Sequence, residues 1–235
     1  MSVFRRRGIE SEEIKEIDEP LDRDAETVLP EAPSLGFVQK VRVEAGIELT
    51  GPFDVSQVDD DTLRRIDFGS LLIPAIDGMQ VRIEVDDQEN VVAVSVMLDD
   101  TAIQLQAFAA PRSEELWDEV RQEIAEGVRG SQGKAREADG TFGRELMAEV
   151  VVNGPDGTSG RQPVRFIGVD GPRWFLRGLI SGPGAQDASK AASVESVFRQ
   201  VAVRRGDHAA PPREPLPLVV PADEGLVSEP PIGSE

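Results

Sequence analysis

Cysteine and tyrosine are absent from this 235-residue chain, and histidine occurs once, as His208. Without cysteine the protein forms no disulfide, has no thiolate nucleophile and offers no cysteine-based zinc or iron–sulfur site. His208 stands at the edge of a proline-rich C-terminal stretch, where we do not expect a base to be held in position. These absences disfavour Ser-His-Asp triads, Cys-His dyads and histidine-rich metal sites. We expect no cofactor. The scarcity of catalytic side chains argues against an enzyme without excluding one.

Long apolar runs and clustered basic charge are also missing. No stretch of about 18 or more apolar residues predicts a membrane-spanning helix. The basic triplet Arg5 to Arg7 is not followed by the apolar core of a secretory signal, so we expect a cytoplasmic protein. The formal net charge is -19. Because binding to phosphate needs clustered lysine and arginine, this composition disfavours direct nucleic-acid binding, and it disfavours anionic lipid as well.

Charge and proline divide the chain into three parts. Residues 10–31 hold ten acidic residues against two basic ones, and from residue 207 onward prolines accompany six acidic residues and one arginine. Both patterns are typical of segments that do not pack into a core. We therefore predict a disordered acidic tail over residues 1–35, a single domain over residues 36–206 and a proline-rich acidic tail over residues 207–235.

The central part alternates short strand patterns with two helical ones. The predicted elements are, in order, a strand ending at Pro74, three strands within residues 81–105, a helix from Ser113, a loop over residues 130–140, three strands within residues 141–181, a helix over residues 187–201 and a short final strand. The first helix has apolar residues at every fourth position, from Leu116 to Val128. Strands joined mostly by hairpins predict an α+β fold, an antiparallel sheet with about two main helices packed on it.

Three adjacent acids, Asp59, Asp60 and Asp61, are the one weak candidate for a metal site. Clustered carboxylates bind hard cations, but this spacing does not match an EF-hand loop, which needs acids at alternate positions and a central glycine. The favoured interpretation is that an aspartate caps the short turn that follows.

The densest stretch is "GVDGPRWFLRG", residues 168–178. Asp170 and Gly171 resemble the two-residue loop of a tight hairpin, which places Val169 opposite Pro172. Side chains alternate along each strand, so one face of this hairpin gathers apolar residues that belong to a core: Ile167, Trp174, Leu176 and Ile180.

The other face of the hairpin combines arginine with phenylalanine, and its members are Phe166, Arg173, Phe175 and Arg177. Two interpretations stay open. A helix covers this face and the arginine stems lie over the rings, or the face is exposed and binds an anionic or acidic partner. These four residues are our candidate binding surface.

Several segments in order resemble a known family: "GPFDVSQVDDD", "RRIDFGSLLIPAIDGM", "LQAFAAPRSEELWDEVR", "RFIGVDGPRWFLRGLISG" and "VFRQVAVRRG". They are similar to an uncharacterised actinobacterial family, the domain-of-unknown-function family numbered 3710, over about residues 51–220. That family carries no activity and no site residue to transfer. The order of strands and helices also looks like the PsbP/Mog1-like sandwich, which implies a fold and no function.

Two functions are consistent with these observations. The first is a non-enzymatic intracellular protein-interaction domain with an unknown protein partner, since catalytic groups are scarce and one face mixes arginine with aromatic residues. The alternative is a ligand-binding or enzymatic domain for an anionic small molecule, with Arg173, Arg177 and carboxylates as its binding groups.

Overall fold

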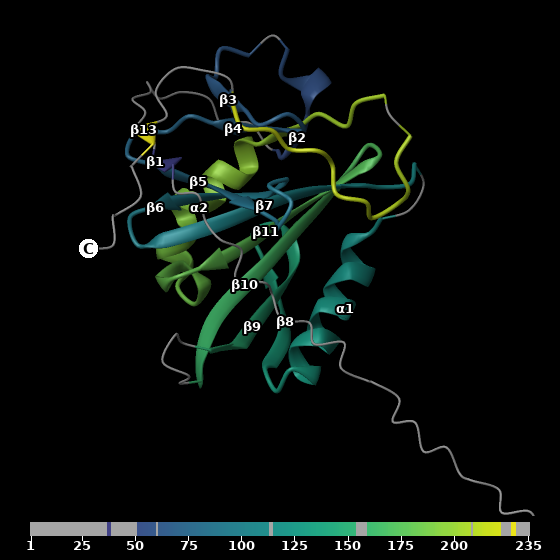
Figure 1. The fold of residues 1–235 in the computed structure, drawn as a ribbon. Coiled ribbons are helices and arrows are strands. Elements are labelled where there is room, and N and C mark those ends of the chain that lie inside the picture. Colours follow the sequence, from purple (N-terminus) through teal and green to yellow (C-terminus); the bar gives the residue numbers. More distant parts are fainter. Residues whose placement is uncertain are drawn as a thin grey trace, which may run out of the picture.

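The computed structural model describes residues 37–38, 51–59, 61–112, 115–153, 159–207, 209–221 and 227–228. Its fold is α+β, as the sequence predicts, with two helices packed against antiparallel-rich sheets (Figure 1). The predicted N-terminal tail (residues 1–35), Ser113 and His208 lie outside the described residues. No helix among the described residues is long and apolar enough to cross a membrane.

A seven-stranded antiparallel sheet forms the centre of the fold. Its strands follow the spatial order β5 (Gln80–Val85), β6 (Val91–Leu98), β7 (Thr101–Ala109), β11 (Trp174–Ser181), β10 (Ser159–Gly171), β9 (Gly143–Asn153) and β8 (Lys134–Gly140). The predicted meander is confirmed as β5–β6–β7, and the predicted strands within residues 141–181 are confirmed as β9, β10 and β11.

A smaller sheet covers part of the large one. Its strands are β2 (Phe53–Asp54), β12 (Ala202–Val203), β4 (Leu71–Pro74) and β3 (Arg65–Asp67), and a 3-10 turn, η1 (Val55–Gln57), follows β2. The single strand expected before Pro74 is therefore two strands, β3 and β4, joined where Gly69 adopts a φ of 85°. Two further short strands, β1 (Phe37–Val38) and β13 (Val227–Ser228), pair with each other.

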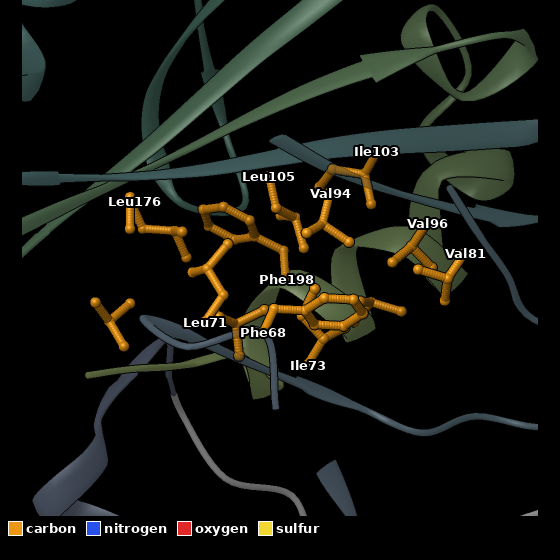
Figure 2. Close-up of a cluster of buried hydrophobic side chains, with 14 of the residues drawn as sticks. Phe68, Leu71, Ile73, Val81, Val94, Val96, Ile103, Leu105, Leu176 and Phe198 are labelled. Carbon is orange, nitrogen blue, oxygen red and sulfur yellow. The ribbon is translucent and has the colours of Figure 1, made fainter. Parts of the chain in front are cut away.

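The two helices cover opposite faces and different halves of the large sheet. Helix α2 (Ala188–Gln200), preceded by η2 (Pro183–Ala185), packs with the small sheet on one face of β5, β6, β7 and β11. Figure 2 shows Phe198 of α2 among side chains of these strands and of β4. Helix α1 (Trp117–Gly130) packs on the other face, over β8, β9 and β10. Consequently the described helices leave most of the α2-side face of β8–β10 uncovered, except where α2 meets Arg165 of β10 (Figure 1).

Strand β8 corrects the loop predicted over residues 130–140. After α1, Gly133 turns the chain back and donates its N–H to the Val128 carbonyl at 2.8 Å. Ala135 then packs into the core under α1, while Lys134 and Arg136 point to the opposite face. Charged side chains are typical of an edge strand, and they mask the period-two pattern that would have predicted one.

Residues 209–221 pack against the domain, although their proline-rich composition predicts that they belong to a C-terminal tail. Leu216 is only 3% exposed, and its N–H donates to the Ala107 carbonyl at 2.8 Å. Arg213 forms ion pairs with Glu119 and Glu123 of α1. The packed part of the chain therefore extends past residue 207.

Candidate functional site

The β10–β11 hairpin turns later than its sequence predicts. Gly171 pairs with Trp174 and Val169 with Leu176, so the two-residue loop consists of Pro172 and Arg173 and the predicted Asp170-Gly171 loop is wrong. Because the displacement is an even number of residues, the two alternating faces are unchanged. The predicted apolar face is confirmed, with Ile167, Trp174, Leu176 and Ile180 in the main core, whereas Arg173 lies in the turn and not on the face of Phe166 and Phe175.

Asp170 and Gly171 make contacts with other parts of the fold and do not form the turn. The Asp170 carboxylate accepts hydrogen bonds from the backbone N–H groups of Leu116, at 2.7 Å, and Trp117, at 3.1 Å. It thereby satisfies free donors at the start of α1 and places negative charge at the positive end of the helix dipole. A Cβ on Gly171 would lie 2.1 Å from the Trp174 ring, so glycine leaves room for that ring.

Helix α1 covers the two phenylalanines of the candidate surface. Phe166 is 4% exposed and Phe175 is 1% exposed. The Phe175 ring stacks on Trp117 and Phe108, with centroids 5.8 and 5.9 Å away. Between the strands and α1, Gly168 admits the Trp117 ring, since a Cβ there would lie 2.4 Å from it. The rings are therefore core residues, as the covered alternative requires, and present no surface to a partner.

The two arginines of that surface are separated from each other. Arg173 lies in the turn with a φ of 64°. Against the desolvation that burial causes, hydrogen bonds from Ser56 and Trp174 lower the pKa of Asp54, and the charge of Arg173 is the least of these causes. Arg177 lies half-buried, donates a hydrogen bond to Gln106 and stands 5.3 Å from the centroid of the Phe108 ring. Burial lowers the pKa of Arg177, and no carboxylate of the described residues pairs with it.

The acidic cluster before β3 has a structural role in its described part. Asp61 forms a bidentate ion pair with Arg65, with both oxygen–nitrogen distances 2.8 Å, and accepts the Leu63 N–H at 3.1 Å. Asp59 is exposed, and Asp60 lies outside the described residues. Within the described ranges no three histidine, aspartate or glutamate side chains are grouped as a metal site.

An open hollow lies on the α2-side face of β8, β9 and β10, the half of the sheet that α2 leaves uncovered. Strand register places three rows on this face, Arg161 beside Val151, then Lys134, Glu149 and Pro163, then Arg136, Met147 and Arg165. The hollow has a volume of about 450 Å³, and η2 contributes Ala185 and its neighbour Gln186 to its wall. We call this surface the basic hollow.

The side chains around the basic hollow are mostly basic and largely unpaired. Arg136 and Arg161 are exposed, and neither forms an ion pair with another described residue. Lys134 lies 3.3 Å from Glu149, in a solvent-exposed pair that contributes little to stability. Three basic groups thus face one acidic group here, on a protein with a net charge of -19.

A buried ionic cluster supports the inner end of the basic hollow. Arg165 of β10 pairs with Glu195 of α2, and its Nη1 lies 3.5 Å from Oε2 of Glu145 on β9. Thr141 donates its hydroxyl to Glu195 at 2.8 Å. Burial raises the pKa of Glu145, against the opposing effect of the Arg165 charge. All three charged residues are buried, so the cluster joins α2 to the sheet and has no open position for a substrate.

Comparison with known proteins assigns the family. A family model described as "Protein of unknown function (DUF3710)" matches residues 51–225. The chain belongs to this family. The match includes both helices, both larger sheets and the packed residues 209–221. No curated protein and no solved structure matches the chain, so the likeness to the PsbP/Mog1-like sandwich stays a prediction.

The sequence alone does not reveal the residues of the basic hollow. Lys134 and Arg136 fall in the stretch predicted as a loop, and Met147 and Arg161 belong to strands whose register was unknown. Only the pairing of β9 with β8 on one side and with β10 on the other brings these side chains onto one face.

Proposed function

We propose that this protein is a non-enzymatic protein-interaction domain that receives an acidic, partly apolar segment of a partner protein in the basic hollow. One observation carries the proposal: two exposed arginines form no ion pair with a described residue, Arg136 in the wall of the hollow and Arg161 two residues before Pro163 of its lining, on an otherwise acidic protein. Arginine and methionine are the side chains that protein interfaces favour, and arginine binds carboxylates through two parallel hydrogen bonds.

The spacing of these arginines defines the segment that would fit. Arg136 lies on β8 and Arg161 on β10, two strands away and four residues further along the sheet. With strands about 4.8 Å apart and about 3.3 Å per residue, their Cα atoms are roughly 16 Å apart. An extended segment with carboxylates about five residues apart spans this distance, and apolar residues between them would contact Met147 and Pro163.

The net negative charge of the protein does not prevent this contact. At physiological ionic strength, charges more than about 8 Å apart are largely screened. The nearest charges therefore decide the interaction, and at the basic hollow these are mostly positive. The same net charge disfavours binding to nucleic acid, whose phosphates are densely spaced. We place the proposed interaction in the cytoplasm.

The half-buried Arg177 favours a second candidate, a site for an anionic small molecule on the opposite face of the sheet. Its guanidinium lacks a carboxylate among the described residues, and a buried charge is stabilised by an opposite one. An anionic ligand would supply that charge, with Gln106 as a second polar contact.

One set of binding measurements tests the proposal and separates the two candidates. The probe is a fluorescein-labelled ten-residue peptide in which glutamates and valines share every second position and so point to one side of an extended chain. It is titrated with the full chain and followed by anisotropy. We expect Arg136→Glu with Arg161→Glu to weaken binding at least about tenfold. The matched control is Arg82→Glu, because Arg82 is exposed and has no described ion pair but lies on the other face of the sheet. That variant should bind normally.

Two results would overturn the proposal. One is equal binding by all variants, and the other is equal binding of a glutamine–valine peptide. If citrate or pyrophosphate instead raises the melting temperature of the full chain and Arg177→Gln abolishes that rise, the small-molecule candidate replaces the proposal.

A further inference from the structure

The chain itself carries a segment with the chemistry that the basic hollow requires. Residues 10–31 contain ten acidic and two basic residues, a net charge of -8, with Ile14, Ile17 and Leu21 interspersed among them. The acidic residues of the other terminus are sparser, since residues 222–235 contain four. Charge complementarity therefore favours the N-terminal segment as an occupant.

The connection between this segment and the domain is long enough. Five residues, 32–36, separate the segment from β1, which contacts β5 at the edge of the large sheet opposite β8. With strands about 4.8 Å apart, β8 lies roughly 29 Å from β5. The fifteen residues 22–36 span up to roughly 50 Å when extended. The N-terminal part of the segment can therefore reach the basic hollow from β1.

Tethering makes even a weak contact effective. A segment tethered to the domain that carries its site is present there at an effective concentration in about the millimolar range. A contact with a dissociation constant of about one millimolar is then occupied much of the time, although the same contact between separate molecules would be largely empty. This favours the protein's own segment over a free partner of similar composition.

We propose that residues 10–31 dock in the basic hollow of the same chain and compete there with the acidic segment of the partner. The inference rests on the proposed function, because it makes that binding site self-occupied in the absence of a partner. Arg136 and Arg161 hold the glutamates and aspartates of the segment, and an incoming partner must displace it. Binding is thereby restricted to partners more acidic or better shaped than the segment.

The absence of cysteine permits a direct test on the full chain. A single Ser11→Cys substitution carrying a nitroxide label should broaden the backbone amide NMR signals of Arg136, Met147 and Arg161. Arg136→Glu with Arg161→Glu should abolish this broadening, about 1 M salt should do so as well, and Arg82→Glu should preserve it. The inference is overturned if the broadening is absent, is spread evenly over the surface, or appears only from a label at Ser234→Cys in the other terminus.

A second variant separates this inference from the proposed function. In it, the ten acidic residues of segment 10–31 are replaced by glutamine or asparagine within the full chain. The glutamate–valine peptide should bind this variant at least about tenfold more tightly than it binds the natural chain. Equal, detectable binding to both would overturn self-occupancy and leave the proposed function standing. No peptide binding to either, with the Ser11 label still broadening the hollow, would leave self-docking standing and refute the proposed function.

Discussion

Replacing Arg165 by methionine removes the positive charge that pairs with two buried carboxylates, Glu145 and Glu195. Breaking a buried ion pair by removing one partner costs about 3–5 kcal/mol, because the remaining charge loses its compensation. The Nε atom of Arg165 has no hydrogen-bond partner among the described residues, so methionine also removes an existing desolvation cost. We therefore expect the lower end, about 3 kcal/mol, out of a total of about 5–15 kcal/mol for a typical domain.

The loss should depend on pH in a defined direction. Burial raises the pKa of Glu145 in the folded protein above its value of about 4.3 in an unfolded chain. The stability contributed by such a group is fully present below the unfolded pKa and is lost as pH rises through the folded pKa. Without Arg165 that folded pKa rises further. The variant should therefore be more destabilised at pH 7 than at pH 5, relative to the natural protein at each pH.

Urea unfolding followed by tryptophan fluorescence measures this effect, with Arg161→Met as the matched control. Arg161 lies on the same strand, is exposed and lacks a described ion pair, so its replacement should change stability by about 0.5 kcal/mol or less. Adding Glu145→Gln and Glu195→Gln to Arg165→Met should recover most of the lost stability. The reasoning is refuted if Arg165→Met costs less than about 1 kcal/mol, or if its cost is equal at both pH values and is not recovered.

Two other substitutions test how α1 is attached to the sheet, each measured by urea unfolding. Asp170→Ala should cost about 1–3 kcal/mol, since it removes both the cap of α1 and the charge that favours its dipole, and Asp170→Asn should cost about half as much; a neutral Asp170→Ala would contradict this. Gly168→Ala should cost about 1–3 kcal/mol because its Cβ meets the Trp117 ring at 2.4 Å. Gly160→Ala on the same strand has its nearest contact at 3.8 Å and should stay within about 0.5 kcal/mol; equal costs at both glycines would refute the argument.

The sequence predicts most of the large sheet and both helices because the spacing of their apolar residues allows only one way of burying them. In the β10–β11 hairpin, Ile167 and Leu176 alternate with Phe166 and Phe175, so each set must face a different layer whatever the turn. The apolar repeat from Leu116 to Val128 likewise requires one face of α1 to be covered.

The turn and the edge strand could not be predicted in this way, because their local signals compete with distant contacts. Aspartate is common in turns, which favours a turn at Asp170. Instead, its carboxylate accepts hydrogen bonds from two backbone N–H groups more than fifty residues earlier in the chain. Strand β8 has charged residues and small alanines, and it is extended because β9 supplies its hydrogen-bond partners.

By itself, the sequence determined the class of the fold, the alternation of its strand faces, the acidic N-terminal segment and the absence of thiol and tyrosine chemistry. These properties depend on residue type and on spacing within short windows. The tertiary structure decided which faces are covered: α1 buries Phe166 and Phe175, whereas on the other face of β8–β10 no described helix covers Arg136 and Arg161, which are exposed. Coverage depends on where each helix packs, and that is set by contacts between residues far apart in the chain.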